Sequence, residues 1–86
     1  MNVYIPSPLR SYTGEKSQVE AGGASLEELL GELDRSYPGL RFRIIDEQDG
    51  IRDHIKIFVN CEQARDLRAS LRGAAEVHIL CALSGG

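Results

Sequence analysis

The segment from Ser25 to Pro38 limits the folds open to this chain more than any other. Ser25 and Glu28 form a capping-box pattern, in which a hydroxyl and a carboxylate three residues apart satisfy backbone N–H groups at a helix start. Apolar residues then recur at helical spacing and fall on one stripe: Leu26, Leu29, Leu30, Leu33 and Tyr37. The sequence therefore predicts one amphipathic helix, ending before Pro38, whose apolar face must be buried against another layer.

Composition and charge restrict the classes of function. The chain has 86 residues, of which 42% are hydrophobic, and this suits one small domain that buries roughly 60% of its unfolded surface. A formal charge of -3 argues against nucleic acid as a partner. No stretch approaches the ~20 apolar residues of a membrane span, and no secretory signal is recognisable. We expect a cytoplasmic protein with no membrane partner.

Short alternating segments on both sides of the helix predict β-strands. Residues 3–5 predict a first strand, and residues 17–20 predict a second strand that returns beside it. Residues 40–45 alternate apolar and basic side chains, which predicts a third strand with Phe42 facing the core. Residues 62–71 are less regular, and we expect a short helical turn there, anchored by Leu67 and Leu71.

Two further segments predict strands whose outer faces carry apolar side chains. Residues 55–59 form a fourth strand with Phe58 pointing away from the core, and residues 77–82 form the last strand with Leu80 on the corresponding face. The order of elements fits an α+β fold, with a mixed sheet of about four to five strands and the helix on one face. Phe58 and Leu80 are candidate partner-binding residues because an exposed apolar patch usually marks a partner site.

The histidines and cysteines give weaker indications. His54 and His78 have no nucleophile or carboxylate at a suggestive spacing, so we expect solvent-facing strand histidines rather than acid–base catalysts. Cys61 and Cys81 are too few for a structural zinc or iron–sulfur site, and no metal site is expected. We expect free thiols, with Cys81 acting as a small apolar residue rather than as a sulfur shuttle.

The chain ends in Ser84-Gly85-Gly86, which makes the α-carboxylate of Gly86 a candidate reactive group. Glycine has no Cβ, so the chain leading to this carboxylate can enter a narrow channel in a partner. A simply frayed chain end is the alternative that residue type alone allows. We expect a domain over residues 1–82 and a flexible tail over residues 83–86.

Taken together, these features resemble the ThiS/MoaD family of small sulfur carriers, which have the ubiquitin-like β-grasp fold. The resemblance covers nearly the whole chain, and its most specific parts are residues 58–60, residues 76–80 and the terminal Ser84-Gly85-Gly86. Cys61 departs from the family, which usually has glycine after the turn asparagine, and Cys81-Ala82-Leu83 lacks the proline often found before the tail. Residues 5–10 and the long 37–57 region are more similar to carriers that feed sulfide into amino-acid biosynthesis.

The resemblance implies a carrier protein rather than an enzyme. An E1-like adenylyltransferase would consume ATP to adenylate the Gly86 carboxylate, and a sulfur donor would convert the adenylate to a thiocarboxylate for a downstream sulfur-accepting synthase. The implied partner-binding residues are Phe58, Leu80, Leu83, Ser84 and Gly85, and no cofactor is expected to be bound. Three alternatives remain open: a MoaD-like small subunit of molybdopterin synthase, a ubiquitin-like modifier joined to lysines through Gly86, and a β-grasp binding module with an unreactive tail.

Overall fold

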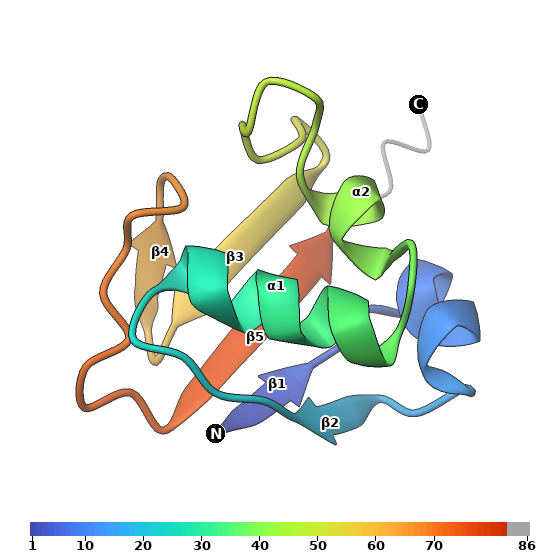
Figure 1. Ribbon diagram of the computed structural model, residues 1–86, viewed down its shortest axis with the longest axis horizontal. Helices are drawn as coiled ribbons and strands as arrows, with labels where there is room; N and C mark the ends of the chain where they lie inside the picture. Colours follow the sequence, from blue (N-terminus) through green and yellow to red (C-terminus); the bar gives the residue numbers. More distant parts are fainter. Residues whose placement is uncertain (83–86) are drawn as a thin grey trace.

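A five-stranded mixed sheet forms one layer of the computed structural model, which describes residues 1–82 (Figure 1). The strands lie in the order β2-β1-β5-β3-β4, and β1 pairs parallel with β5 while the other neighbours are antiparallel. Their bounds are β1 (Asn2–Tyr4), β2 (Gln18–Glu20), β3 (Ile55–Val59), β4 (Glu62–Ala64) and β5 (Glu76–Cys81). The predicted α+β class with a mixed sheet is confirmed. The predicted tail, residues 83–86, lies outside the described residues.

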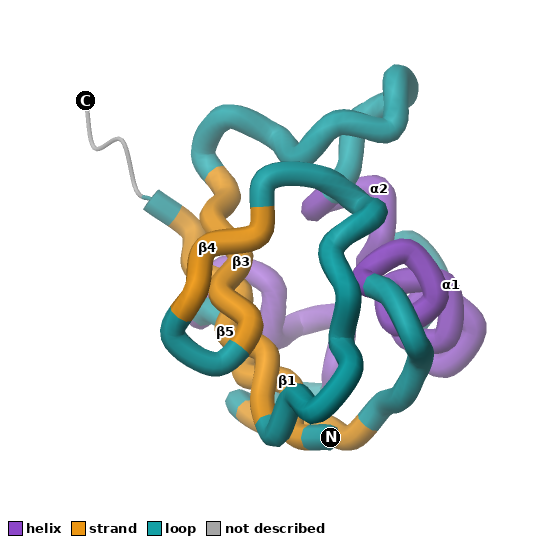
Figure 2. Tube along the Cα trace, turned by 90° about the vertical axis from the view of Figure 1, so that its left-hand side faces the viewer, coloured by secondary structure: helices purple, strands orange, loops and turns teal. Residues whose placement is uncertain are grey.

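The predicted helix is α1 (Leu26–Ser36), and it lies across one face of the sheet (Figures 1 and 2). The Ser25 hydroxyl accepts a hydrogen bond from the Glu28 N–H at 3.3 Å, while the Glu28 carboxylate accepts from the Ala24 N–H at 3.0 Å. The capping box is therefore present, with Glu28 reaching one residue further back than the standard pattern. The four leucines of the predicted stripe are buried against the inner face of the sheet. Within residues 1–82, no helix has the length and apolar character needed to cross a membrane.

The strand predicted for residues 40–45 is wrong, because most of this segment forms the short helix α2 (Leu40–Ile44). Leu40 and Ile44 are four residues apart, so both face the core on a helix as they would on a strand. Phe42, expected inside, is instead 55% exposed. The Asp34 carboxylate accepts hydrogen bonds from the N–H groups of Gly39 and Arg41, at 3.1 and 3.2 Å, which fixes the start of α2.

One other segment differs in part from the sequence prediction. The segment 62–71 begins with β4, which pairs with β3 through the register Val59 to Glu62. Its predicted helical turn is reduced to a single turn, in which the Ala69 N–H donates to the Asp66 carbonyl at 3.3 Å. The anchors Leu67 and Leu71 are nevertheless buried, as expected. Residues Ser7–Thr13 form the 3-10 helix η1, which lies between β1 and β2 in the chain.

The tight turn between β3 and β4 relies on Asn60. Asn60 has a φ of 56°, a left-handed conformation that asparagine tolerates better than most residues. Its side-chain oxygen accepts hydrogen bonds from the N–H groups of Ala75 and Glu76, at 3.0 and 3.3 Å, and so ties the turn to the start of β5. Cys61 is not among the residues with positive φ, so its replacement of the family's usual glycine carries no left-handed strain here.

Replacing Asn60 is expected to lower the free energy of unfolding. Asn60→Ala removes the side-chain acceptor and leaves a Cβ residue in the left-handed region, for a loss of about 2 kcal/mol. Asn60→Gly removes the same acceptor but suits the conformation, so we expect it to lose about 1 kcal/mol less than alanine does. Urea unfolding of the three chains measures the difference, and equal stabilities of the alanine and glycine variants would show that the φ angle is unimportant.

Candidate functional site

The candidate site is built around the C-terminal end of β5, where the described chain leaves the sheet. Strand β5 is central, with β1 on one side and β3 on the other. The Ala82 N–H donates to the His54 carbonyl at 2.7 Å, which extends the pairing beyond the strand. Residues 77 and 78 of β5 are paired on both sides, and pairing with β3 alone continues to Cys81, which holds in the sheet the point from which the tail starts. The predicted residues Leu83, Ser84, Gly85 and Gly86 follow this point and lie outside the described residues.

The outer face of the sheet, turned away from α1, carries the two predicted docking residues. Phe58 on β3 is directly opposite His78 on β5, and Lys56 is opposite Leu80. Phe58 and Leu80 are therefore diagonal neighbours on adjacent strands, close enough for their side chains to form one patch. Leu80 is 48% exposed and Phe58 is half-buried. The prediction that these two side chains share one outward face is confirmed, while their role in binding stays a prediction.

The structure adds an aromatic extension to this patch that sequence reasoning missed. Tyr4 on β1 is opposite His78, and the two rings stack with centroids 4.3 Å apart and planes 10° from parallel. The His78 Nε2 lies 3.0 Å from the Glu76 carboxylate. His78 thus has a carboxylate partner that its spacing did not suggest to us. Strand alternation could have indicated the position of Tyr4, because its neighbour Val3 is buried and Tyr4 must therefore face outward. We call Tyr4, Phe58, His78 and Leu80 the outer patch.

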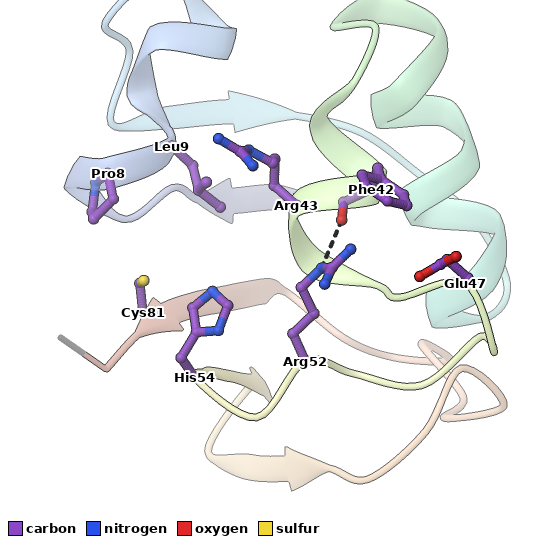
Figure 3. A pocket seen from close by; sticks show the side chains of 8 residues that line it. All are labelled: Pro8, Leu9, Phe42, Arg43, Glu47, Arg52, His54 and Cys81. Atoms are coloured by element: carbon purple, nitrogen blue, oxygen red, sulfur yellow. Dashed lines mark hydrogen bonds between the residues drawn. The ribbon is translucent and has the colours of Figure 1, made fainter. Parts of the chain in front are cut away.

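A hollow of about 430 Å³ lies on the other side of the end of β5 (Figure 3). Pro8 and Leu9 of η1 and Phe42 of α2 supply apolar side chains to it, and Cys81 of β5 lines it near the point where the chain leaves the sheet. Arg43, Arg52 and His54 also line it, and Figure 3 shows Glu47 at the side away from Cys81. We call this feature the arginine hollow. Its residues come from four separate parts of the chain, so sequence spacing gave no sign of it.

Aromatic rings support both arginines of the hollow. The Arg52 guanidinium lies 4.7 Å from the centroid of the Phe42 ring, and its Nε donates to the Phe42 carbonyl at 2.8 Å. The Arg43 guanidinium lies 5.8 Å from the centroid of the Tyr12 ring. Such cation–π contacts orient a guanidinium without neutralising its charge. Within residues 1–82, neither arginine forms an ion pair.

The loop that carries Arg52 and His54 is held by Asp46. The Asp46 carboxylate accepts hydrogen bonds at 2.9 Å from the N–H groups of Gly50 and Gln48, and these bonds lower the pKa of Asp46 below its ordinary value, that of Gly50 most. Because the folded pKa is lowered, this stabilisation of the loop is complete above the ordinary pKa. It is lost as the pH falls through the lowered value.

The other candidate residues are placed as follows. His54 is exposed, as expected, but it lies in the loop before β3 rather than in a strand. Cys81 is half-buried and packs against the core, in line with its expected apolar role, while Cys61 is an exposed thiol. In the part of the chain that the structure describes, both cysteines are free, and no group of three or more His, Cys, Asp or Glu side chains is placed to hold a metal ion.

Comparison with solved structures places this chain in the class of ubiquitin-like β-grasp proteins. The CysO chain of the Amycolatopsis orientalis BexX/CysO complex has a TM-score of 0.88 at 31% identity, covering 99% of this chain and 98% of that chain. Small archaeal modifier protein 1 from Methanosarcina acetivorans has a TM-score of 0.79 at 26% identity, covering 99% of this chain and 94% of the other. The β-grasp expectation is confirmed.

The chain belongs to the ThiS family, whose family model matches residues 3–86. It is 32% identical over 91 residues to sulfur carrier protein CysO of Mycobacterium tuberculosis (strain ATCC 25618 / H37Rv), a match that spans 100% of this chain and 98% of the relative. The family match therefore extends through the described domain to the terminal glycine. These relatives are named as carriers and not as enzymes.

Proposed function

We propose that this protein is a sulfur carrier that transports sulfur as a thiocarboxylate on Gly86. The observation that carries the proposal is the full-length homology to a sulfur carrier protein, which includes the terminal Gly-Gly. The fold supports it, because a central strand of the sheet leads directly to the reactive end. The domain supplies a carboxylate and a docking surface, and the partner enzymes supply the catalytic residues.

The chemistry explains why activation must come first. A carboxylate is a poor electrophile because its negative charge repels a nucleophile and because oxide is a poor leaving group. An E1-like adenylyltransferase would join the Gly86 carboxylate to the AMP part of ATP, releasing pyrophosphate. A persulfide sulfur from a donor would then attack the carbonyl carbon and displace AMP, and reductive cleavage of the S–S bond by a thiol would leave the thiocarboxylate. This protein would bind no cofactor, and ATP would be consumed in the partner's active site.

The downstream acceptor is proposed to be a synthase of amino-acid biosynthesis. The support is the homology to CysO over the whole length, together with the N-terminal segment and the long 37–57 region that distinguish the sequence from shorter carriers. In this proposal the acceptor synthase, like the activating enzyme, binds the carrier transiently. Both partners act inside the cytoplasm, where ATP and reduced thiols are available.

Intact-mass analysis tests the proposal. The purified full-length chain is incubated with a candidate E1-like adenylyltransferase, ATP and a persulfide donor. We expect a mass increase equal to the replacement of one oxygen atom by sulfur. Alkylation of the thiocarboxylate followed by hydrolysis of the resulting thioester should restore the original mass. No mass change with any activating enzyme of the host would contradict the proposal.

A second candidate function is protein modification, which the likeness to small archaeal modifier protein 1 favours. Both functions use the same acyl adenylate and differ in the nucleophile, which is a sulfur donor for a carrier and a lysine amine for a modifier. Proteolysis of cell extracts distinguishes them. Gly-Gly remnants on lysines of other proteins, lost when the gene is deleted, would favour the modifier, whereas a thiocarboxylate on the purified chain favours the carrier.

A further inference from the structure

We propose that the arginine hollow is a second docking site, which receives an acidic segment of a partner protein at the end of β5. The hollow is lined by two arginines and by apolar side chains, and it lies next to the end of the strand from which the reactive tail leaves. The inference concerns a partner that acts on the tail, so its biological meaning rests on the proposed function. The binding property itself can be measured without that chemistry.

The charged side chains that line the hollow indicate that a bound partner segment would be acidic. The whole chain carries a formal charge of -3, yet two arginines and one carboxylate, that of Glu47, line this hollow, and Figure 3 shows Glu47 at the far side. The Asp46 carboxylate does not line the hollow, although the charge of Arg52 contributes to its lowered pKa. The arginines are oriented by aromatic rings and form no ion pair within residues 1–82. Guanidinium groups held in this way bind carboxylates with fixed geometry and lose little freedom on binding.

The shape of the hollow favours a protein segment over a free small molecule. Sites for small ligands enclose most of the ligand surface. Here Phe42 is 55% exposed, and Pro8, Arg43 and His54 are exposed as well, so the walls cannot enclose a small anion. A partner surface would complete the enclosure. It would place carboxylates on the arginines and an apolar side chain against Phe42.

The position of the hollow explains what such contact would achieve. The outer patch and the arginine hollow lie on opposite sides of the end of β5, since Leu80 points to the outer face and Cys81 lines the hollow. A partner that contacts both would hold the strand end from two sides. Apolar contacts would supply affinity at the outer patch, while charge pairing at the hollow would speed encounter and fix orientation.

The direct test is an NMR titration with a blocked pentapeptide that alternates glutamate and leucine. We expect saturable shifts of the Arg43 and Arg52 Nε–H signals and of the Cys81 amide, weakened by added salt and absent with a peptide carrying glutamine in place of glutamate. The double variant R43Q/R52Q should abolish these shifts. The double variant R35Q/R72Q, which changes the net charge equally on exposed residues away from the hollow, should retain them.

Four outcomes would overturn the proposal. The first two are that the peptide causes no shifts at the hollow, or that the glutamine peptide causes equal shifts. The other two are that inorganic phosphate saturates the hollow as readily as the peptide does, or that the chain self-associates with concentration and R43Q/R52Q removes this association. The last two would assign the hollow to small anions or to a second copy of the chain.

The kinetics of activation by the partner enzyme provide a second test of the docking site. With the activating enzyme, R43Q/R52Q should raise KM about tenfold at low salt with kcat unchanged, and R35Q/R72Q should change neither. An unchanged KM would show that this enzyme does not use the hollow. If the unmodified chain forms no thiocarboxylate while the peptide still binds, the proposed function fails and the docking site stands.

Discussion

Removal of Gly86 is expected to abolish thiocarboxylate formation while leaving the fold intact. The shortened chain still ends in a glycine carboxylate, but that group is displaced by one residue, or about 3.5 Å along an extended chain. A misplacement of about 1 Å from the reacting geometry can lower a rate 100-fold, so we expect a loss of at least that size. Intact-mass analysis after incubation with the activating enzyme, ATP and a sulfur donor measures it.

Gly86→Ala provides the matched control for this deletion. It keeps the length of the chain and the position of the carboxylate, and it adds one Cβ where a narrow channel is expected. We expect activation to be reduced but detectable, and the melting temperatures of all three chains to be the same because the described sheet ends at Cys81. Full biological activity of the shortened chain would contradict carboxylate chemistry and would indicate a β-grasp module with an unreactive tail.

The fold could be predicted wherever one periodic pattern admitted only one structure. Helix α1 has apolar residues at i, i+3, i+4 and i+7 behind a capping residue, and no strand satisfies that pattern. Residues 40–44 instead present Leu40 and Ile44 separated by four positions, which bury equally well on a strand or on one turn of helix. The choice was made by tertiary contacts, namely the hydrogen bonds from Gly39 and Arg41 to Asp34, and not by local alternation.

Strand β4 could not be predicted from its own residues. Glu62, Gln63 and Ala64 have little preference for strands. They form one because the tight turn at Asn60 returns the chain beside β3. The Asn60 side chain also reaches Glu76 at the start of β5, sixteen residues further along the chain, and nothing in the local sequence indicates that contact.

Of the candidate site, the outer patch could be predicted in part and the arginine hollow could not, because the hollow depends on contacts between distant parts of the chain. The outer patch follows from strand alternation, which placed Phe58 and Leu80 outward before their neighbours were known. The stacking of Tyr4 on His78 required knowledge that β1 pairs with β5, and this is a contact between distant parts of the chain. The arginine hollow required both α2 and the 46–54 loop to be placed, and α2 was the element predicted wrongly.

Substituting Phe58 and Leu80 together by serine is expected to weaken activation strongly by removing the apolar part of the outer patch. At an interface, loss of a central apolar side chain typically costs about 1–2 kcal/mol, so loss of two should raise KM by roughly 30-fold or more with kcat unchanged. The fold should persist, because the fully buried side chains all belong to other positions and Leu80 is 48% exposed. Steady-state kinetics with the activating enzyme, together with urea unfolding, separate the two effects.

The conservative pair Phe58→Leu and Leu80→Met is the control, since it keeps apolar area on the same strands and should restore most of the activity. Such a rescue would show that the outer patch contributes apolar contact rather than sheet stability. Unchanged activation kinetics in the serine variant would contradict docking at this face. Partner recognition would then rest on the other side of β5, where the arginines line the hollow beside Cys81.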